Sequence, residues 1–330
     1  MGSPLPTVCG FCGCGCGLYF DVGLAGEVVG VGPSPGHPVS QGRLCRRGWH
    51  LHQPLRSGER WRRPTVRPGQ ERREVSWAAA VAIAAQALRE ALQAGPVGVL
   101  GSARSTNEDA FVLQKFARIV LGTNHVDFLG RASQAPTQRI FREVNRETPS
   151  LGTLEDLATA HVVLVVGLAD GGRWPQVWPF LLAAKRRGAT LVVVDDWQGD
   201  LAVQATHLLL PRPHTDPAWL YGLAASLWPE APVALTLAEA AAVCGVPSAD
   251  LQAVANELRS ATRVAVVYDP TSPTRLTGVA SAQALATLAA ALGHTGAACA
   301  ILPLAERCNS LGVLEMGLAP HLLSGYQPLD

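Results

Sequence analysis

Hydrophobic and polar residues follow one pattern in the first 64 residues and another in the rest of the chain. Residues 1–64 are rich in Cys, Gly, Arg and Pro and contain one strand–turn–strand pattern, over 18–22 and 27–31. After them, short runs of Val and Leu alternate with segments long enough for helices. This alternation is typical of a parallel sheet that helices cover on both faces. We therefore predict an α/β protein that begins with a small irregular domain.

The α/β pattern begins at Ser76, a residue suited to cap a long Ala-rich helix. A buried strand, a second helix and a short strand follow and open an α/β layer. A second α/β unit begins near residue 150, and the last 35 residues, from Gly296, are expected to be extended. The predicted helices are 76–94, 107–121, 178–187, 216–227, 248–260 and 279–292, and the predicted strands are 96–100, 125–128, 161–167, 190–195, 207–210 and 263–269.

Composition narrows the class of protein. Of the 330 residues, 48% are hydrophobic and 16% are charged, and the net charge is +1. Such a chain has enough apolar residues to fold and no charge excess that would attract nucleic acid. Its apolar stretches are shorter than the roughly 20 residues that cross a bilayer, so we expect no direct membrane insertion. The first eight residues show no export signal, which favours a cytoplasmic location.

Cysteine spacing is the strongest chemical signal. Cys9, Cys12 and Cys16 share one Gly-rich loop, and Cys45 follows after a long interval. Four thiolates suit a [4Fe–4S] cluster, and glycines permit the positive φ angles that a loop around a cluster needs. Tetrahedral zinc and free thiols are the alternatives, although four-cysteine zinc sites usually consist of two CxxC pairs. We predict a [4Fe–4S] cluster domain over residues 1–64.

The other four cysteines are not part of this pattern. Cys14 is an extra thiol in the loop, either a bystander or an exchangeable ligand. Cys244, Cys299 and Cys308 are scattered along the chain and are interpreted as small core residues.

A basic run begins directly after Cys45, with Arg46 and Arg47. One interpretation is a solvated surface. The other is a surface that raises the reduction potential of the cluster or meets an acidic electron-transfer partner. The residues leave both open.

Four sequence blocks occur in order, and together they resemble the catalytic subunits of the molybdopterin-dependent formate dehydrogenases, within the wider molybdopterin oxidoreductase family. The resemblance implies an iron–sulfur domain followed by doubly wound parallel-sheet, Rossmann-like domains. Residues 65–149 would form the first part of one α/β domain, and residues 150–330 would form an α/β domain of the dinucleotide-binding type. The blocks are the cysteine loop with Gly-Arg-Leu-Cys-Arg-Arg-Gly at 42–48, Ser-Ala-Arg-Ser-Thr-Asn-Glu at 102–108, Leu-Gln-Lys-Phe-Ala-Arg at 113–118 with Leu-Gly-Thr-Asn at 121–124, and Asn309, Gly312, Met316, Gly317 and Pro320 with Gly325 and Tyr326.

The resemblance also shows where the reaction chemistry is altered. Ser133 and Gln134 stand where the family has a molybdenum-binding Cys or selenocysteine and a His that assists proton transfer. Serine can bind molybdenum in related enzymes, whereas Gln134 cannot transfer a proton. Arg47 stands where a lysine is thought to relay electrons between cluster and pterin.

The implied site for a molybdopterin guanine dinucleotide is altered as well. Its turns correspond to Leu168–Asp170, to Asp195 and the four residues after it, and to His214, Thr215 and Asp216. Carboxylates at two positions where arginines are expected would repel the phosphates. In the alternative, Asp195 and Asp216 only close a strand and cap a helix.

Length shapes the functional prediction. Family catalytic subunits are about twice as long, and this chain stops where the first dinucleotide-binding domain is expected to end. We predict an iron–sulfur electron-transfer subunit that lacks formate chemistry itself and whose incomplete face is covered by other subunits of a redox complex. One alternative is the N-terminal half of a split formate dehydrogenase that binds molybdenum or tungsten after assembly. The other is a purely structural or assembly role.

Overall fold

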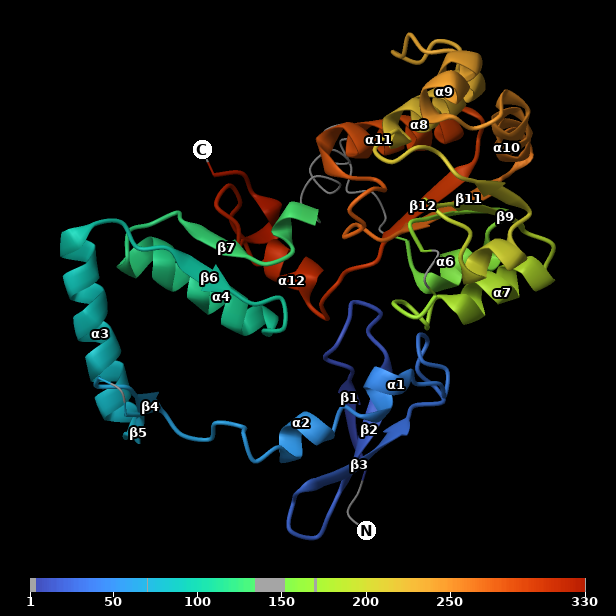
Figure 1. The fold of residues 1–330 in the computed structure, drawn as a ribbon. Helices are drawn as coiled ribbons and strands as arrows, with labels where there is room; N and C mark the ends of the chain where they lie inside the picture. Colours follow the sequence, from blue (N-terminus) through green and yellow to red (C-terminus); the bar gives the residue numbers. More distant parts are fainter. Residues whose placement is uncertain (1–3, 70, 134–151, 169–170, 330) are drawn as a thin grey trace. The chain divides into compact units, whose positions relative to one another are not determined.

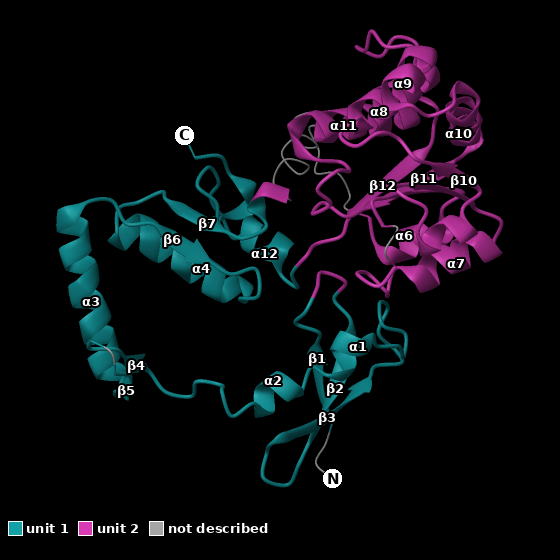
Figure 2. Ribbon diagram, in the orientation of Figure 1, with its two compact units in different colours: residues 1–11, 15–131, 307–330 teal, residues 12–14, 132–306 magenta. Residues whose placement is uncertain are grey.

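A computed structural model of the chain describes residues 4–69, 71–133, 152–168 and 171–329. They form two compact units, which Figure 2 colours separately. Unit 1 comprises residues 1–11, 15–131 and 307–330, and unit 2 comprises 12–14 and 132–306. The C-terminal segment therefore groups with unit 1, a different division from the sequence domains 1–64, 65–149 and 150–330, which remain a prediction.

The N-terminal part of unit 1 is built on a three-stranded antiparallel sheet in the order β1-β2-β3. The predicted hairpin is confirmed, because β2 pairs with β3 around the turn at residues 23–27. The elements are β1 (Leu5–Val8), β2 (Gly17–Val22), β3 (Val28–Pro33), the short helices α1 (Arg46–Trp49) and α2 (Gln53–Arg56), and the two-residue strands β4 (Thr65–Val66) and β5 (Arg73–Glu74).

The second part of unit 1 combines residues from both ends of the chain (Figure 1). Ser76 caps α3 as predicted, since its hydroxyl accepts a hydrogen bond from the backbone of Ala79. β6 and β7 pair in parallel. The elements are α3 (Trp77–Ala94), β6 (Val99–Gly101), α4 (Asn107–Lys115), which continues as the π-helical turn η1 (Phe116–Val120), β7 (Val126–Phe128), α12 (Ser310–Glu315) and η3 (Ser324–Tyr326).

Arg118 fastens the C-terminal segment to α4. Its guanidinium donates hydrogen bonds to the backbone carbonyls of Gly317, Ala319 and Leu322, at 2.8–2.9 Å. The side chain of Asn309 adds a hydrogen bond to Asn107, at the start of α4. These contacts explain why two family-like blocks far apart in the sequence belong to one fold.

Two predictions in this region are wrong. The strand expected at 96–100 is not buried, because Leu100 in the middle of β6 is 84% exposed. Within the described residues β6 pairs only with β7, and only the face of Gly101 is covered, by Leu113 and Leu318. The segment from Gly296 is not simply extended, since it contains the helix α12.

Unit 2 is a doubly wound sheet of five parallel strands in the order β10-β9-β8-β11-β12. Helices α6 and α7 lie on one face, and α8, α10 and α11 lie on the other (Figure 1). The strands are β8 (Val162–Val166), β9 (Thr190–Val194), β10 (His207–Leu209), β11 (Arg263–Tyr268) and β12 (Ala298–Pro303), and the helices are α6 (Leu154–Thr159), α7 (Trp178–Arg186), η2 (Asp200–Gln204), α8 (Asp216–Leu227), α9 (Leu237–Cys244), α10 (Ser248–Ser260) and α11 (Gly278–His294).

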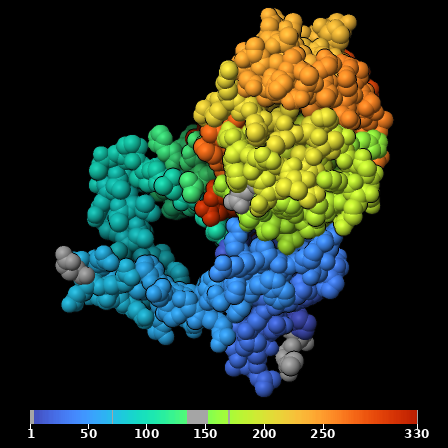
Figure 3. Space-filling model, turned by 45° about the vertical axis from the view of Figure 1, so that its right-hand side comes forward, coloured from blue at the N-terminus to red at the C-terminus, as the bar shows by residue number. Residues whose placement is uncertain are grey.

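The core of unit 2 confirms the predicted parallel sheet. Every residue of β8 is buried, as a strand covered on both faces requires. One face packs against Trp219 and Leu220 of α8 and the apolar sides of α10 and α11, and the residues of α8 to α11 form one continuous body in the space-filling view (Figure 3). The sequence analysis missed α6 and α9, although each begins with a capping box, at Thr153 and Thr236.

No helix in the described ranges is both long enough and apolar enough to span a bilayer.

Candidate functional site

The cysteine loop connects β1 to β2. Strand pairing places Val8 opposite Gly17, so Cys9 and Cys16 begin and end the connection. The backbone N–H of Cys9 donates to the carbonyl of Cys16 at 2.8 Å, and the positive φ of Gly15, 69°, turns the chain back toward β2. Cys9, Cys12 and Cys16 are all buried, at 5–8% exposure.

Cys45 comes from a segment that is anchored beside Cys16. The buried hydroxyl of Ser40 donates to the carbonyl of Gly17 at 2.7 Å, and the Nδ1 atom of His37 accepts from the N–H of the same glycine at 3.2 Å. Gly17 directly follows Cys16, so these bonds fix the segment that leads to Cys45. The sequence analysis missed Ser40 and His37, because their partner lies about 20 residues away and only the fold brings them together.

Within the described residues, no group of three or more His, Cys, Asp and Glu side chains forms a preformed metal cage. The four thiols nevertheless fit an iron–sulfur cluster by their chemistry, since cysteine thiolates are the usual ligands of such clusters. Other thiols are less suited. Burial raises the pKa of Cys244 and raises that of Cys299 to about 12, which keeps both protonated.

Positive charge lies beside Gly10 and Phe11, in the first part of this loop. Arg104 donates to the carbonyl of Gly10 and lies 5.8 Å from the centre of the Phe11 ring. Arg46 and Arg47, in α1, line an open pocket of about 880 Å³, and His50, the residue that follows α1, lines it too. The other lining residues are Phe11, Gln53, Pro54 and Ser57. Cations near a thiolate cluster stabilise its more negative, reduced state.

Ser133 lies in unit 2. It lines a pocket of about 290 Å³ with Thr271, Ser272 and Thr277, among other residues of the loop after β11. Gln134 lies outside the described residues.

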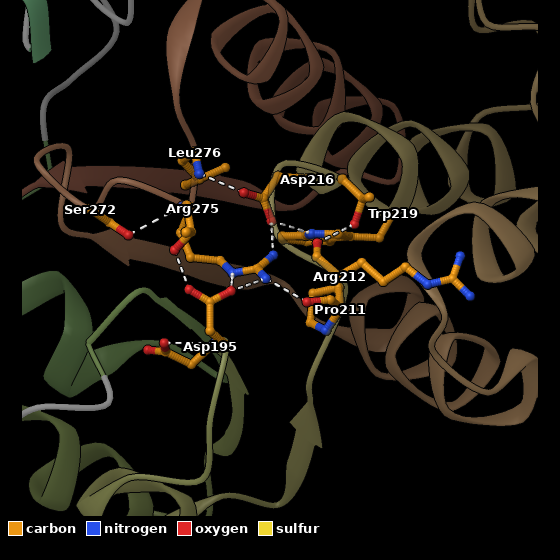
Figure 4. Close-up of polar contacts among 11 residues, drawn as sticks. Asp195, Pro211, Arg212, Asp216, Trp219, Ser272, Arg275 and Leu276 are labelled. Atoms are coloured by element: carbon orange, nitrogen blue, oxygen red, sulfur yellow. Dashed lines mark hydrogen bonds and ion pairs between the residues drawn. The ribbon is translucent and has the colours of Figure 1, made fainter.

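The predicted dinucleotide residues lie at the carboxyl edge of the sheet, where Figure 4 shows their contacts. Asp195 follows β9 and is buried, and its Oδ1 atom accepts from the backbone N–H of Asp196 at 2.8 Å. Thr215 donates its hydroxyl to the carbonyl of Arg212 at 2.6 Å. Of the turn at Leu168–Asp170, the last two residues lie outside the described part of the chain.

Asp216 begins α8 and is 1% exposed. Its Oδ1 atom accepts from Trp219 and from Arg275, both at 2.8 Å, and its Oδ2 atom accepts from the N–H of Leu276 at 2.6 Å (Figure 4). The carboxylate is thus held by a buried arginine that sequence reasoning missed. The only signal was a lone charge in the Thr-, Ser- and Pro-rich loop after a predicted strand.

Family models match most of the N-terminal two thirds of the chain. The molybdopterin oxidoreductase Fe4S4 domain matches residues 5–57, and the molybdopterin oxidoreductase domain matches residues 60–211. The chain belongs to the molybdopterin oxidoreductase family. The first match includes all four predicted ligands, Cys9, Cys12, Cys16 and Cys45, and supports a [4Fe–4S] cluster. Membership of the family is compatible with a molybdopterin cofactor, and the second match ends before Thr215 and Asp216.

Relatives within the family are formate dehydrogenase subunits. The F420-dependent formate dehydrogenase subunit alpha of Methanocaldococcus jannaschii is 27% identical over 98% of this chain and 51% of its own length. The F420-dependent formate dehydrogenase 1 subunit alpha of Methanococcus maripaludis is 28% identical over 97% of this chain and 50% of its own length. The chain spans about half the length of these curated relatives.

A solved structure supports the fold. The acetylene hydratase of Pelobacter acetylenicus superposes with a TM-score of 0.75 at 18% sequence identity, covering 88% of this chain and 43% of the hydratase. The predicted fold class, an iron–sulfur domain followed by a doubly wound sheet of the molybdopterin oxidoreductase type, is confirmed.

Proposed function

We propose that this chain is an iron–sulfur electron-transfer subunit of a larger redox complex and that it lacks formate chemistry of its own. The observation that carries the proposal is the Fe4S4-domain match, which contains all four cysteines in the spacing that a cluster requires. When bound, the cluster supplies one-electron redox chemistry. Cys9, Cys12, Cys16 and Cys45 would hold it.

The chain's own residues set the conditions for electron transfer. The closed loop buries Cys9, Cys12 and Cys16, and the anchored segment before Cys45 leads to a thiol that is partly exposed. Arg47 contributes positive charge at the adjacent pocket and thereby favours the reduced state. Ser133 and Gln134, in place of the family's metal ligand and proton carrier, are the reason to assign relay rather than formate oxidation to this chain.

The test is metal analysis of the full chain, purified anaerobically in its native state. We expect about four iron atoms per chain and no molybdenum or tungsten, together with a reversible one-electron signal by electron paramagnetic resonance. Iron without any redox signal would support the structural role instead. Zinc in place of iron would refute the cluster, and with it the relay.

Partners are proposed on the exposed apolar surface of unit 1. Leu100 of β6 points away from the face that Leu113 of α4 covers, and it is exposed. Val112 of α4 and Ile119 and Val120 of η1 are exposed as well. An exposed parallel strand with apolar neighbours normally has a cover, because parallel sheets are usually buried on both faces. We assign that cover to another subunit of the complex, and a cytoplasmic location remains our prediction.

A substitution tests this assignment. Leu100→Lys should reduce self-association of the chain purified alone and weaken its capture by the native complex, while leaving iron content unchanged. Leu24→Lys is the matched control, because Leu24 is also exposed but lies in the turn between β2 and β3. Equal behaviour of the two variants would argue against this surface as the subunit contact.

The second candidate is the N-terminal half of a split molybdopterin-dependent formate dehydrogenase. Two observations favour it: the relatives are named as F420-dependent formate dehydrogenase subunits, and this chain spans about half their length. Co-production with a polypeptide that corresponds to their second half distinguishes the proposals. One molybdenum or tungsten per assembled complex that is lost in Ser133→Ala would favour the split enzyme, and its absence would favour the relay.

A further inference from the structure

In a doubly wound sheet, ligands bind at the carboxyl ends of the strands, where the strand order reverses. In unit 2 that point lies between β8 and β11. Gly167, after β8, and the loop 269–277, after β11, border it. The course of this loop determines whether a ligand has room there.

The loop crosses the carboxyl end of β8 in close contact. A Cβ atom built on Gly167 would lie 3.2 Å from the Cβ of Arg275 and 3.3 Å from the Cβ of Ser272. Gly167 has a φ of 70°, and its N–H donates to the carbonyl of Val194, at the end of β9. The side chains of Arg275 and Ser272 therefore fill the space next to Gly167, at the end of β8.

Arg275 fastens the far end of this loop. Its side chain is fully buried and donates to Asp216 at 2.8 Å, to Asp196 at 2.9 Å from Nε, and to the carbonyl of Pro211 (Figure 4). Thr274 also donates to Asp196. One guanidinium thus joins the loops that follow β9, β10 and β11. A buried charge is tolerated only with such complete pairing.

Asp269 fastens the near end. It is 3% exposed, and its Oδ1 atom accepts from the N–H and the hydroxyl of Thr271, at 2.8 and 2.6 Å. Its Oδ2 atom accepts from Trp174 at 3.3 Å and pairs with Arg173 at 3.2 Å. The loop is held at both ends by carboxylates, so opening it would separate several buried polar pairs.

We propose that the loop 269–277, fastened by Arg275, closes the ligand crevice of unit 2, so that this unit binds no guanine dinucleotide and serves as a structural module. The residues do not fit the phosphates of such a cofactor. Asp196 and Asp216 present negative charge, and the positive charge of Arg275 is already shared between them. The inference is independent of the proposed relay, since iron content and nucleotide content are separate measurements.

The first test is release of nucleotide from the native, anaerobically purified full chain. Acid denaturation followed by chromatography should yield far less than one guanine nucleotide per chain. Stoichiometric release would overturn the proposal. Equilibrium dialysis of the native chain against GDP should likewise show no saturable binding, and saturable binding at micromolar GDP would overturn it.

The second test concerns the closed loop itself. Hydrogen exchange of the native chain should show slow exchange at the amide of Leu276, which is bonded to buried Asp216. Arg275→Met should speed this exchange by more than tenfold and lower the melting temperature by roughly 10 °C. Arg212→Met is the control, because Arg212 points away from the network (Figure 4) and contacts the carbonyls of Ala242 and Val243. Fast exchange in the native chain, or equal effects of the two variants, would overturn the proposal.

Discussion

The cysteine loop between β1 and β2 and the carboxyl edge of the sheet in unit 2 differ in the side chains that they offer to a cofactor. The N-terminal segment contains all four predicted ligands, three in the loop and Cys45 after it, and the side chains of His37 and Ser40 hold the backbone at Gly17. At the sheet edge, Asp196 and Asp216 lie in the turns that we predicted for a dinucleotide, and Arg275 pairs with both. If the proposal for unit 2 holds, a scaffold of this family can keep one cofactor site while its own side chains fill the place of another.

The largest expected effect concerns the loop. Cys12→Ser should remove nearly all of the roughly four iron atoms, because a cubane loses its anchoring when one of four thiolates becomes a hydroxyl. Iron analysis and visible absorption of the anaerobic protein measure this. Cys14→Ser, two residues away in the same loop, should keep the iron. Full iron in the first variant, or loss in the second, would show that the ligand set is different.

The next effect concerns the sheet edge. Asp216→Asn should lower the free energy of unfolding by about 3 kcal/mol, because it leaves Arg275 buried with one carboxylate instead of two. Chemical denaturation followed by circular dichroism measures the change. Asp200→Asn, at an exposed aspartate of η2, should change it by less than about 0.5 kcal/mol. A neutral result at Asp216 would mean that the buried network does not stabilise unit 2.

A smaller effect links positive charge to the cluster. Arg47→Gln should lower the reduction potential by on the order of 40 mV, since removing about 1 kcal/mol of favourable interaction disfavours the more negative, reduced state. Redox titration of the purified chain measures it. Arg89→Gln, on an exposed position of α3, should leave the potential unchanged. An unchanged potential in Arg47→Gln would assign the basic run to an ordinary solvated surface.

The smallest effect is a pH dependence outside both regions. Burial raises the pKa of Asp127, but the hydrogen bonds and charge of Arg131, the backbone N–H of Phe128 and the charge of His321 together outweigh burial and lower it overall. A carboxylate whose pKa is lower in the folded state than in the unfolded state stabilises the fold at pH values above its unfolded pKa. This stabilisation is lost as the pH falls through the folded-state pKa. Because both side chains are about one third exposed, the effect should be below about 1 kcal/mol. Asp127→Asn should therefore reduce the stability difference between pH 6 and pH 3, measured against Glu71→Gln.

Much of this protein followed from short stretches of sequence. The four cysteines, the hairpin after the first three ligands and the strands β8 to β11 depend on local spacing and on runs of Val and Leu, and the α/β class and the positions of these strands were predicted on that basis. Strand β12 was expected only as part of an extended segment. Helix α9 was missed although Thr236 and Glu239 form its capping box, because the segment is short and Ala-rich.

Tertiary structure alone decided the contacts that give these segments their roles. The return of residues 307–330 to unit 1 depends on Arg118, whose three carbonyl partners lie about 200 residues away. The exposure of Leu100 depends on which strands pair beside it, and the burial of Arg275 depends on Asp196 and Asp216 lying on different loops. The sequence by itself determined which residues could bind iron and which could form strands. Only the fold decided which charges are buried together, because burial and pairing are properties of segments distant in sequence that meet in space.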